Sequence, residues 1–164
     1  MRRLIRSALF VPASKPRAIE KAAHVGADLL ILDLEDAVGP DEKDEARARV
    51  AETLDSWSAS GAIRAVRVNG PDTAWNAADM REAARADAIV LPKVNQVGDL
   101  HAARSALSTH GTSIPIWAMV ETPLGVMNLN GIASATGTGL AGLIAGTNDL
   151  AKELRCTAEQ ARLA

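Results

Sequence analysis

The chain has 164 residues, 48% of them hydrophobic, and carries a formal net charge of −2 at pH 7. This length and apolar content fit one globular domain with a buried core, and the small negative charge argues against a nucleic-acid or anionic-membrane surface. The single cysteine, Cys156, excludes an internal disulfide and a thiolate-rich metal site. We therefore expect a cytoplasmic protein whose partners are small molecules.

The first residues do not have the pattern of a targeting segment. Basic residues within positions 1–6 are followed by an apolar run that stops at Pro12 without a small-residue cleavage site. No apolar run approaches the roughly 18 residues that a membrane helix needs. The sequence therefore predicts neither a secretory signal nor a membrane span.

Short apolar runs alternate with longer stretches rich in Ala, Glu and Arg, which is the pattern of βα units. Strands are predicted over residues 8–11, 29–34, 62–68, 88–92, 116–121 and 140–145. Helices are predicted between and after them, over residues 16–25, 41–59, 73–86, 97–109 and 126–134. Because the strands are almost continuously apolar, we expect both of their faces to be buried in a parallel sheet, which gives an α/β fold.

The first predicted helix has recognisable signals at both ends. Ser14 is a candidate N-cap, and Pro16 fits the first turn, where its missing N–H costs nothing. Gly26 lies just beyond the predicted end, where a left-handed residue often terminates a helix.

Two parallel architectures compete for this pattern, an open doubly wound sheet and a closed (β/α)₈ TIM barrel. The Gly-rich sequence at residues 137–142 precedes a strand instead of following one, so it does not support dinucleotide binding. The barrel is therefore preferred. A barrel needs eight strands, and about six βα units are present, so we expect residues 1–164 to form one barrel domain that lacks its last two strands.

Charged and polar residues follow the predicted strands where a barrel enzyme carries its chemistry. They recur roughly every 26–31 residues, the length of one βα unit. If the strands close into a barrel, all of these residues surround one mouth: Glu35 and Asp36, Arg67, Lys93, Glu121, and Asp149.

Glu121 and Asp149 follow neighbouring predicted strands, with no cysteine or histidine beside them. Two carboxylates of this kind suit Mg²⁺, which keeps its other positions for water and substrate oxygens. Arg67 offers a planar cationic fork for a carboxylate or a carbonyl oxygen. Together they predict a site for a 2-oxo acid and enolate chemistry or C–C cleavage beside a carbonyl. Either carboxylate alone could instead cap a helix or pair with Arg67.

The role of Lys93 has two interpretations. A Schiff-base lysine would lie at such a strand end, and so would a counter-charge for neighbouring carboxylates. Gly146 and Thr147 closely precede Asp149 and are predicted, with Lys93, to contact the substrate. Asp33, in the middle of its predicted strand, is expected to face the barrel interior or a polar neighbour.

Six segments of the chain resemble the HpcH/HpaI aldolase superfamily in order and spacing, and the resemblance covers nearly the whole sequence. Its most similar branch is the citrate lyase beta-subunit-like proteins, which include malyl-CoA, citramalyl-CoA and citryl-CoA lyases. The segments are RSALFVP (6–12), LDLEDAV (32–38), VRVNG (66–70), LPKV (91–94), MVETPLGV (119–126) and GTNDL (146–150).

The resemblance implies a (β/α)₈ barrel in which Glu121 and Asp149 hold Mg²⁺ and Arg67 binds the oxo acid. It also implies that Glu35 and Asp36 lie beside the metal, where they order waters and orient basic neighbours. The segment around Arg6 is similar to one that helps to bind CoA phosphates, together with nearby Lys15 and Arg17. Many lyases of the branch carry a glutamate where this chain has Asn148.

The function implied is a Mg²⁺-dependent C–C lyase. Such an enzyme cleaves or forms a 3-hydroxyacyl-CoA, yielding a 2-oxo acid or carboxylate plus acyl-CoA. Two alternatives are a CoA-independent class II-type aldolase acting on pyruvate or a related 2-oxo acid, and a non-catalytic barrel subunit. A C-terminal lid is expected outside the chain, and the family suggests a homo-oligomer, either a trimer or a hexamer.

Overall fold

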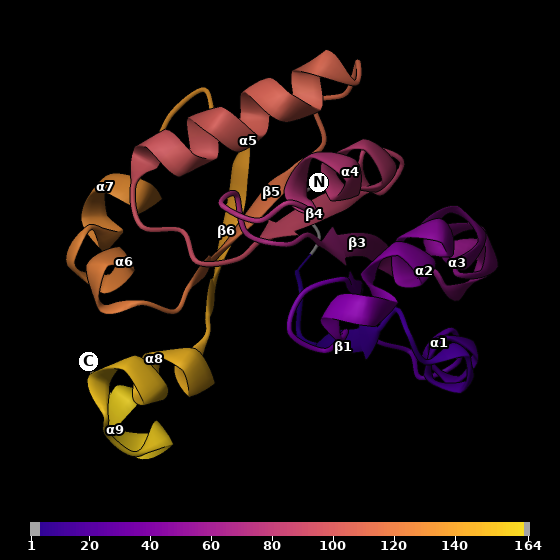
Figure 1. Ribbon diagram of the computed structural model, residues 1–164, viewed down its shortest axis with the longest axis horizontal. Coiled ribbons are helices and arrows are strands. Elements are labelled where there is room, and N and C mark those ends of the chain that lie inside the picture. The colour runs from indigo at the N-terminus through magenta and orange to yellow at the C-terminus, as the bar shows by residue number, and fades with distance from the viewer. Residues whose placement is uncertain (1–3, 163–164) are drawn as a thin grey trace. The chain divides into compact units, whose positions relative to one another are not determined.

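The computed structural model describes residues 4–162, in which strands alternate with helices (Figure 1). The strands are β1 (Ala8–Pro12), β2 (Leu29–Asp33), β3 (Ile63–Arg67), β4 (Ala88–Leu91), β5 (Ile116–Val120) and β6 (Leu140–Ala145). The helices are α1 (Pro16–Ala22), α2 (Lys43–Ala48), α3 (Val50–Ser56), α4 (Asn76–Ala83), α5 (Val97–Thr109), α6 (Pro123–Met127), α7 (Leu129–Ala133), α8 (Thr147–Leu154) and α9 (Ala158–Ala161), with short 3₁₀ turns η1 (Pro40–Glu42) and η2 (Ser58–Ser60).

The six strands form one sheet in the order β1-β2-β3-β4-β5-β6. The pairing is parallel, with Ala8 opposite Leu29 and Leu29 opposite Ile63. Consecutive order is that of a βα barrel, whereas a doubly wound sheet reverses its order at a switch point. The predicted α/β class and the preference for the barrel order are therefore confirmed over six βα units.

Two predicted helices are each divided in the structure. The helix expected over residues 41–59 consists of η1, α2, α3 and η2, and Arg49 joins α2 to α3. The helix expected over 126–134 begins earlier, at Pro123, and is divided at Asn128. Thr122 explains the early start, because its side chain caps α6 by accepting from the Gly125 N–H. The Asn128 side chain donates to the Asn95 carbonyl at 2.8 Å, which holds the division in place.

The predicted cap of the first helix is wrong. Lys15 occupies the N-cap position of α1 and makes no side-chain cap hydrogen bond, and Pro16 is the first helical residue as expected. Gly26 does adopt a positive φ of 72°, but α1 ends earlier, at Ala22.

The chain divides into two compact units, Met1–Ile89 and Val90–Ala164. In the amino-terminal unit, β2 is buried along its whole length, as expected for a parallel strand with a neighbour on each side. Trp57 is completely buried, and its indole N–H donates to the Ile19 carbonyl at 3.0 Å. This bond fastens the end of α3 to α1.

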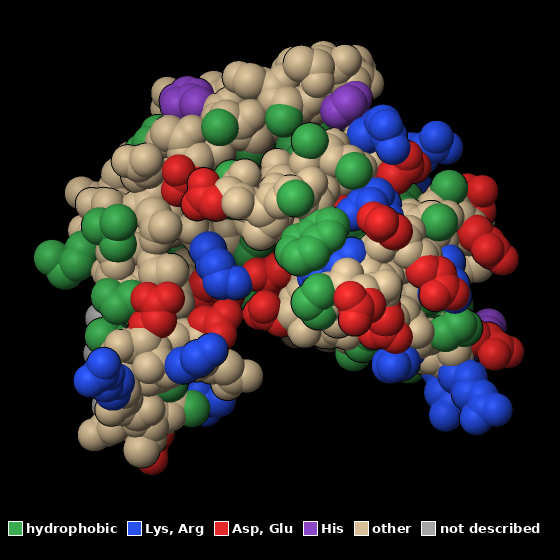
Figure 2. Space-filling view, viewed as in Figure 1, with side chains coloured by type: hydrophobic (Ala, Val, Ile, Leu, Met, Phe, Trp, Pro, Cys, Tyr) green, Lys and Arg blue, Asp and Glu red, His purple; other side chains and the backbone are tan. Residues whose placement is uncertain are grey.

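In the carboxy-terminal unit, α5 buries Leu100, Ala103 and Leu107 and begins at a capping box formed by Gln96 and Asp99. The prediction of two buried faces is wrong for β6, whose residues are exposed or half-buried. β6 is the last strand in the order, so the described residues cover it less completely than the central strands. Hydrophobic side chains also protrude over α6 and α7 (Figure 2).

None of the helices within residues 4–162 is both long and apolar enough to cross a membrane.

Two arginine–aspartate ion pairs of matching geometry, called clasps below, join neighbouring strands at or near their amino ends. Arg6 donates through Nε and Nη2 to the two carboxylate oxygens of Asp28, at 3.0 and 2.8 Å, just before β1 and β2. Arg64 binds Asp87 in the same way, at 2.8 and 2.7 Å, near the starts of β3 and β4. In both clasps the arginine backbone N–H also donates to the carboxylate at 2.9 Å.

These clasps predict acid-sensitive stability. Hydrogen bonds from Arg6 hold the pKa of Asp28 far below its ordinary value, and hydrogen bonds from Arg64 lower the pKa of Asp87. A carboxyl group whose pKa is lower in the folded state stabilises the fold above its unfolded pKa of about 3.9, and that stabilisation disappears as the pH falls. We expect D28N and D87N to lose less stability than the wild type between pH 6 and pH 3, as measured by urea unfolding.

E20Q is the control for this prediction, because Glu20 is exposed on α1. An unchanged loss of stability with pH in D28N and D87N would contradict the assignment.

Candidate active site

Arg67, the last residue of β3, is held by a fixed set of carboxylates. The register places it directly opposite Asp33, the last residue of β2. Its Nε and Nη2 atoms lie 2.7 and 2.5 Å from the two carboxylate oxygens of Asp33. Its Nη1 atom lies 2.9 Å from Glu35 and 3.9 Å from Asp36. The predicted group of Arg67, Glu35 and Asp36 therefore does lie together, with Asp33 at its base.

The environment of Arg67 keeps its charge fixed. Arg67 and Asp33 are 8% and 1% exposed, and the guanidinium lies 5.0 Å from the Phe10 ring centroid. Burial alone would lower the pKa of Arg67, but the hydrogen bond with Asp33 and the charges of Asp33, Glu35 and Asp36 outweigh it and raise this pKa. A permanently charged, rigid guanidinium suits the binding of a carboxylate.

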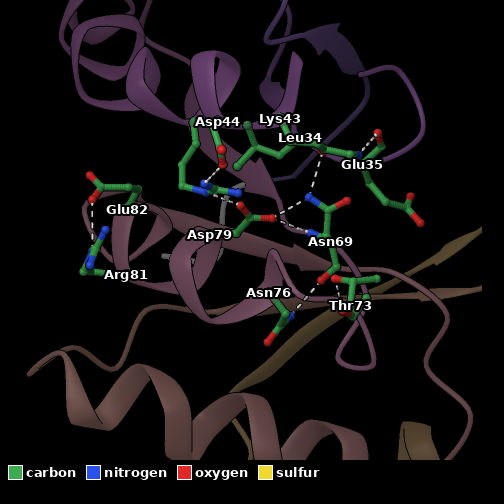
Figure 3. A network of polar contacts seen from close by, with 12 residues as sticks. Leu34, Glu35, Lys43, Asp44, Asn69, Thr73, Asn76, Asp79, Arg81 and Glu82 are labelled. Carbon is green, nitrogen blue, oxygen red and sulfur yellow. Dashed lines mark hydrogen bonds and ion pairs between the residues drawn. The ribbon is translucent and has the colours of Figure 1, made fainter. Parts of the chain in front are cut away.

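A second network holds the chain that follows β2 (Figure 3). Lys43, which is 6% exposed, donates to the carbonyls of Leu34 and Glu35 at 2.7 and 2.6 Å. Asn69 also donates to the Leu34 carbonyl, at 2.9 Å, and to Asp79 at 2.6 Å. The backbone that presents Glu35 is therefore fixed by two buried side chains.

Lys43 is a buried cation surrounded by acidic groups. Burial lowers its pKa, and the negative charges of Asp33, Glu35 and Asp79 oppose that shift. Its ammonium group also lies 5.3 Å from the Trp75 ring centroid, within the range of a cation–π contact.

The network continues into helices α2 and α4. Asp79 of α4 accepts from Nε of Arg47 at 2.7 Å, and Arg47 also donates to Asp44 at 2.7 Å. The Asn76 side chain donates to the Asn69 carbonyl at 2.7 Å. These contacts, drawn in Figure 3, join α2 and α4 to the loop after β3.

Arg6 lies at the other end of β1 from these groups, in the clasp with Asp28. Substrate binding by Arg6 remains a prediction, and it would compete with Asp28 for the guanidinium. Lys15 and Arg17, at the start of α1, are exposed, and basic side chains gather over this helix in Figure 2.

Glu121, which directly follows β5, is a buried carboxylate in the carboxy-terminal unit. It is 1% exposed, and its Oε1 atom accepts from the backbone N–H of Lys93 at 2.7 Å. Lys93 has a φ of +52°, a left-handed conformation that is uncommon outside glycine. This amide N–H fixes the orientation of the carboxylate.

The pairing of β5 with β6 brings the second predicted metal ligand to the same region. Val120 is opposite Ala145, so Glu121 is adjacent to Gly146. A Cβ atom at Gly146 would overlap Oε2 and Cβ of Glu121, so only glycine leaves room for this carboxylate. Asp149 lies in the first turn of α8, which begins at Thr147 directly after Gly146.

The donor chemistry of this region fits Mg²⁺. Among the residues that the structure describes, no cluster of three or more His, Cys, Asp or Glu side chains has the arrangement of a metal site. Two carboxylates with water and substrate oxygens satisfy Mg²⁺, which rarely uses an all-protein cage. The buried Glu121 carboxylate and Asp149, in the first turn of α8, supply oxygen donors of this kind.

The site residues fall into two groups, one in each unit. Asp33, Glu35, Asp36 and Arg67 lie in the amino-terminal unit, and Lys93, Glu121, Gly146, Thr147 and Asp149 lie in the carboxy-terminal unit. Their arrangement around a single mouth remains a prediction.

The sequence alone assigns no role to Lys43, Asn69 and Asp79. Asn69 was recognisable as a polar residue directly after a predicted strand. Lys43 and Asp79 lie on helices, where charged residues are usually exposed, so their burial could not be read from the pattern.

Comparison with known proteins identifies relatives that match most of the chain. A sequence model of HpcH/HpaI aldolase/citrate lyase matches residues 6–163. A (3S)-malyl-CoA thioesterase of Cereibacter sphaeroides is 46% identical over 161 residues, which are 97% of this chain and 54% of that protein. An L-malyl-CoA/beta-methylmalyl-CoA lyase of Rhodobacter capsulatus is 34% identical over 82% of this chain and 46% of its own length. The chain thus spans about half the length of these relatives.

Solved structures agree with the sequence relatives. The citrate lyase beta subunit of M. tuberculosis, complexed with oxaloacetate and magnesium, superposes with a TM-score of 0.74 at 30% identity. The match covers 92% of this chain and 61% of that one.

The Arg67 geometry predicts a strong effect of removing Asp33. In D33A, Nε and Nη2 of the buried Arg67 guanidinium lose their hydrogen-bond acceptor. Breaking a buried ion pair in this way costs about 3–5 kcal/mol. We expect D33A to lower the free energy of unfolding by this amount in urea titrations, and D33N to lower it less because the amide oxygen still accepts a bond. D72A, at an exposed loop position, is the control. Wild-type stability in D33A would contradict the assignment.

Proposed function

Because the chain belongs to the HpcH/HpaI aldolase/citrate lyase family, we propose that it acts on CoA thioesters as a Mg²⁺-dependent C–C lyase. Its substrate would be a 3-hydroxyacyl-CoA of the citryl-, malyl- or citramalyl-CoA type, cleaved to a 2-oxo acid or carboxylate and an acyl-CoA, or formed from them. The observation that carries the proposal is the buried Glu121 carboxylate, oriented by an amide and a glycine next to the helical turn that bears Asp149.

In this proposal Glu121 and Asp149 hold the metal. A bound Mg²⁺ acts as a Lewis acid on a carbonyl or hydroxyl oxygen and fixes the substrate carboxylate. The first turn of α8 favours negative charge because of the helix dipole, which suits a carboxylate ligand at this position. Magnesium and oxaloacetate in the M. tuberculosis citrate lyase beta subunit support this choice of ion and substrate class.

Arg67 would bind the carboxylate of the oxo acid and stabilise charge on its carbonyl oxygen. Asp33 holds one side of the guanidinium, and Glu35 and Asp36 lie near Nη1. The acidic pair would therefore orient Arg67 and order water beside the metal. Thr147 would contact the substrate near Asp149, and Arg6 the CoA moiety.

A second reaction has specific support. The relative with 46% identity is a malyl-CoA thioesterase, which hydrolyses a thioester rather than cleaving a C–C bond. The same metal and arginine could bind a hydroxy acid thioester for attack by water. We therefore propose thioester hydrolysis as the alternative activity, in addition to the CoA-independent aldolase reaction on a free 2-oxo acid.

The metal-site proposal predicts the binding behaviour of three variants. In isothermal titration of the protein at its natural full length, oxaloacetate binding should require Mg²⁺. Both E121A and D149A should weaken Mg²⁺ binding at least tenfold, because each removes an anionic ligand. E153A, which changes an exposed glutamate on α8, should bind as the wild type does. Metal-independent oxaloacetate binding, or unchanged binding in both ligand variants, would contradict the site.

The products formed from malyl-CoA distinguish the candidate reactions. A lyase gives acetyl-CoA and glyoxylate, with no free thiol, whereas a thioesterase gives malate and CoA, whose thiol a colorimetric reagent detects. We expect acetyl-CoA and glyoxylate, formed only with Mg²⁺ and lost in R67A. Free CoA as the main product would replace the lyase assignment with the thioesterase, and conversion of free 2-oxo acids alone would favour the aldolase.

A further inference from the structure

Lys93 has a backbone conformation that its place in the fold does not explain. Lys93 and Arg155 are the non-glycine residues with positive φ among residues 4–162. Arg155 ends α8, where a left-handed residue is ordinary. Lys93 follows β4 and precedes α5, so it ends no helix. A non-glycine residue in this region is strained, and such strain persists only where the surrounding structure enforces it.

The left-handed turn directs two successive amides toward β5 and the residue that follows it. The Lys93 N–H donates to Oε1 of Glu121 at 2.7 Å, and the Val94 N–H donates to the Met119 carbonyl at 3.0 Å. The next residue continues the attachment, because the Asn95 side chain accepts from the Thr122 hydroxyl. The loop after β4 is thus fastened to the end of β5 at three consecutive positions.

Gly146 confines the same carboxylate from another strand. Its backbone N–H donates to the Val120 carbonyl at 3.0 Å, which fixes the glycine beside Glu121. Any Cβ at this position would overlap the Glu121 side chain, including its Oε2 atom. The carboxylate therefore has a hydrogen-bond donor at Oε1 and a close glycine backbone at Oε2.

We propose that Lys93 serves the site through its main chain: its left-handed backbone and the absent side chain at Gly146 together hold the Glu121 carboxylate in one orientation for magnesium. Lys93 is then a positioning residue rather than a Schiff-base lysine. This inference rests on the proposed metal site, and it assigns to Lys93 and Gly146 a role that needs no contact with substrate.

Substitutions at Lys93 separate the main chain from the side chain. Glycine and asparagine accept a left-handed backbone, whereas β-branched valine does not, and all three remove the amine. In Mg²⁺ titrations of the protein at its natural full length, K93G and K93N should bind within about threefold of the wild type. K93V should bind about 10–100-fold more weakly, the usual effect of losing a group that orients a metal ligand. An equal loss in all three would assign the effect to the amine and overturn the proposal.

Gly146 gives a second test with a matched control. G146A should weaken Mg²⁺ binding about 10–100-fold, because the new methyl displaces the Glu121 carboxylate. G131A adds a methyl in α7 that would lie 3.7 Å from Val97, an ordinary contact, and should bind as the wild type does. Wild-type affinity in G146A would overturn the proposed positioning.

Hydrogen exchange of the Lys93 amide, measured without metal, distinguishes failure of this inference from failure of the metal site. The amide should be protected in the wild type and in G131A, and should exchange at least tenfold faster in E121A. A protected amide in a wild type that binds no Mg²⁺ would support the positioning and contradict the proposed metal site. Rapid exchange of this amide in the wild type would overturn the positioning whatever the metal affinity.

Discussion

Burial of carboxylates at the ends of parallel strands is the constraint on which this structure depends. Parallel strands direct their carboxyl ends to the same edge of a sheet, so polar residues that follow the buried strands collect there. Asp33 ends β2 and Glu121 follows β5, and each is 1% exposed. A buried carboxylate is costly unless hydrogen bonds and positive charge compensate it. The partners of these two residues therefore determine what each unit can do.

The two units compensate their buried carboxylates differently. In the amino-terminal unit, Arg67 contacts both oxygens of Asp33, and the resulting ion pair fixes the arginine that we expect to bind substrate. In the carboxy-terminal unit, the Lys93 amide and the glycine backbone at Gly146 orient Glu121. In the proposed site, the first arrangement would present a cation to an anionic substrate, and the second would present an anion to a metal. Both arrangements are held by contacts within the protein, which is how preorganised sites gain affinity.

The sequence predicted a structural feature correctly where that feature depends on residues within one βα unit. The strands were predicted because each is a short apolar run, and α5 was predicted over its observed range, Val97–Thr109. The division at Asn128 and the left-handed backbone of Lys93 were not, because both depend on tertiary contacts with other segments. Likewise, Asp33 could be placed facing a polar neighbour, but its pairing with Arg67 follows from the register of β2 and β3.

The most direct test of the account is a crystal structure of the protein at its natural full length with Mn²⁺, as a substitute for Mg²⁺, and oxaloacetate. The anomalous signal of Mn²⁺ locates the ion independently of the protein atoms. We expect one ion about 2 Å from carboxylate oxygens of both Glu121 and Asp149, with the oxaloacetate carboxylate against Arg67. An ion bound elsewhere, or oxaloacetate seated without an ion at these two carboxylates, would contradict it.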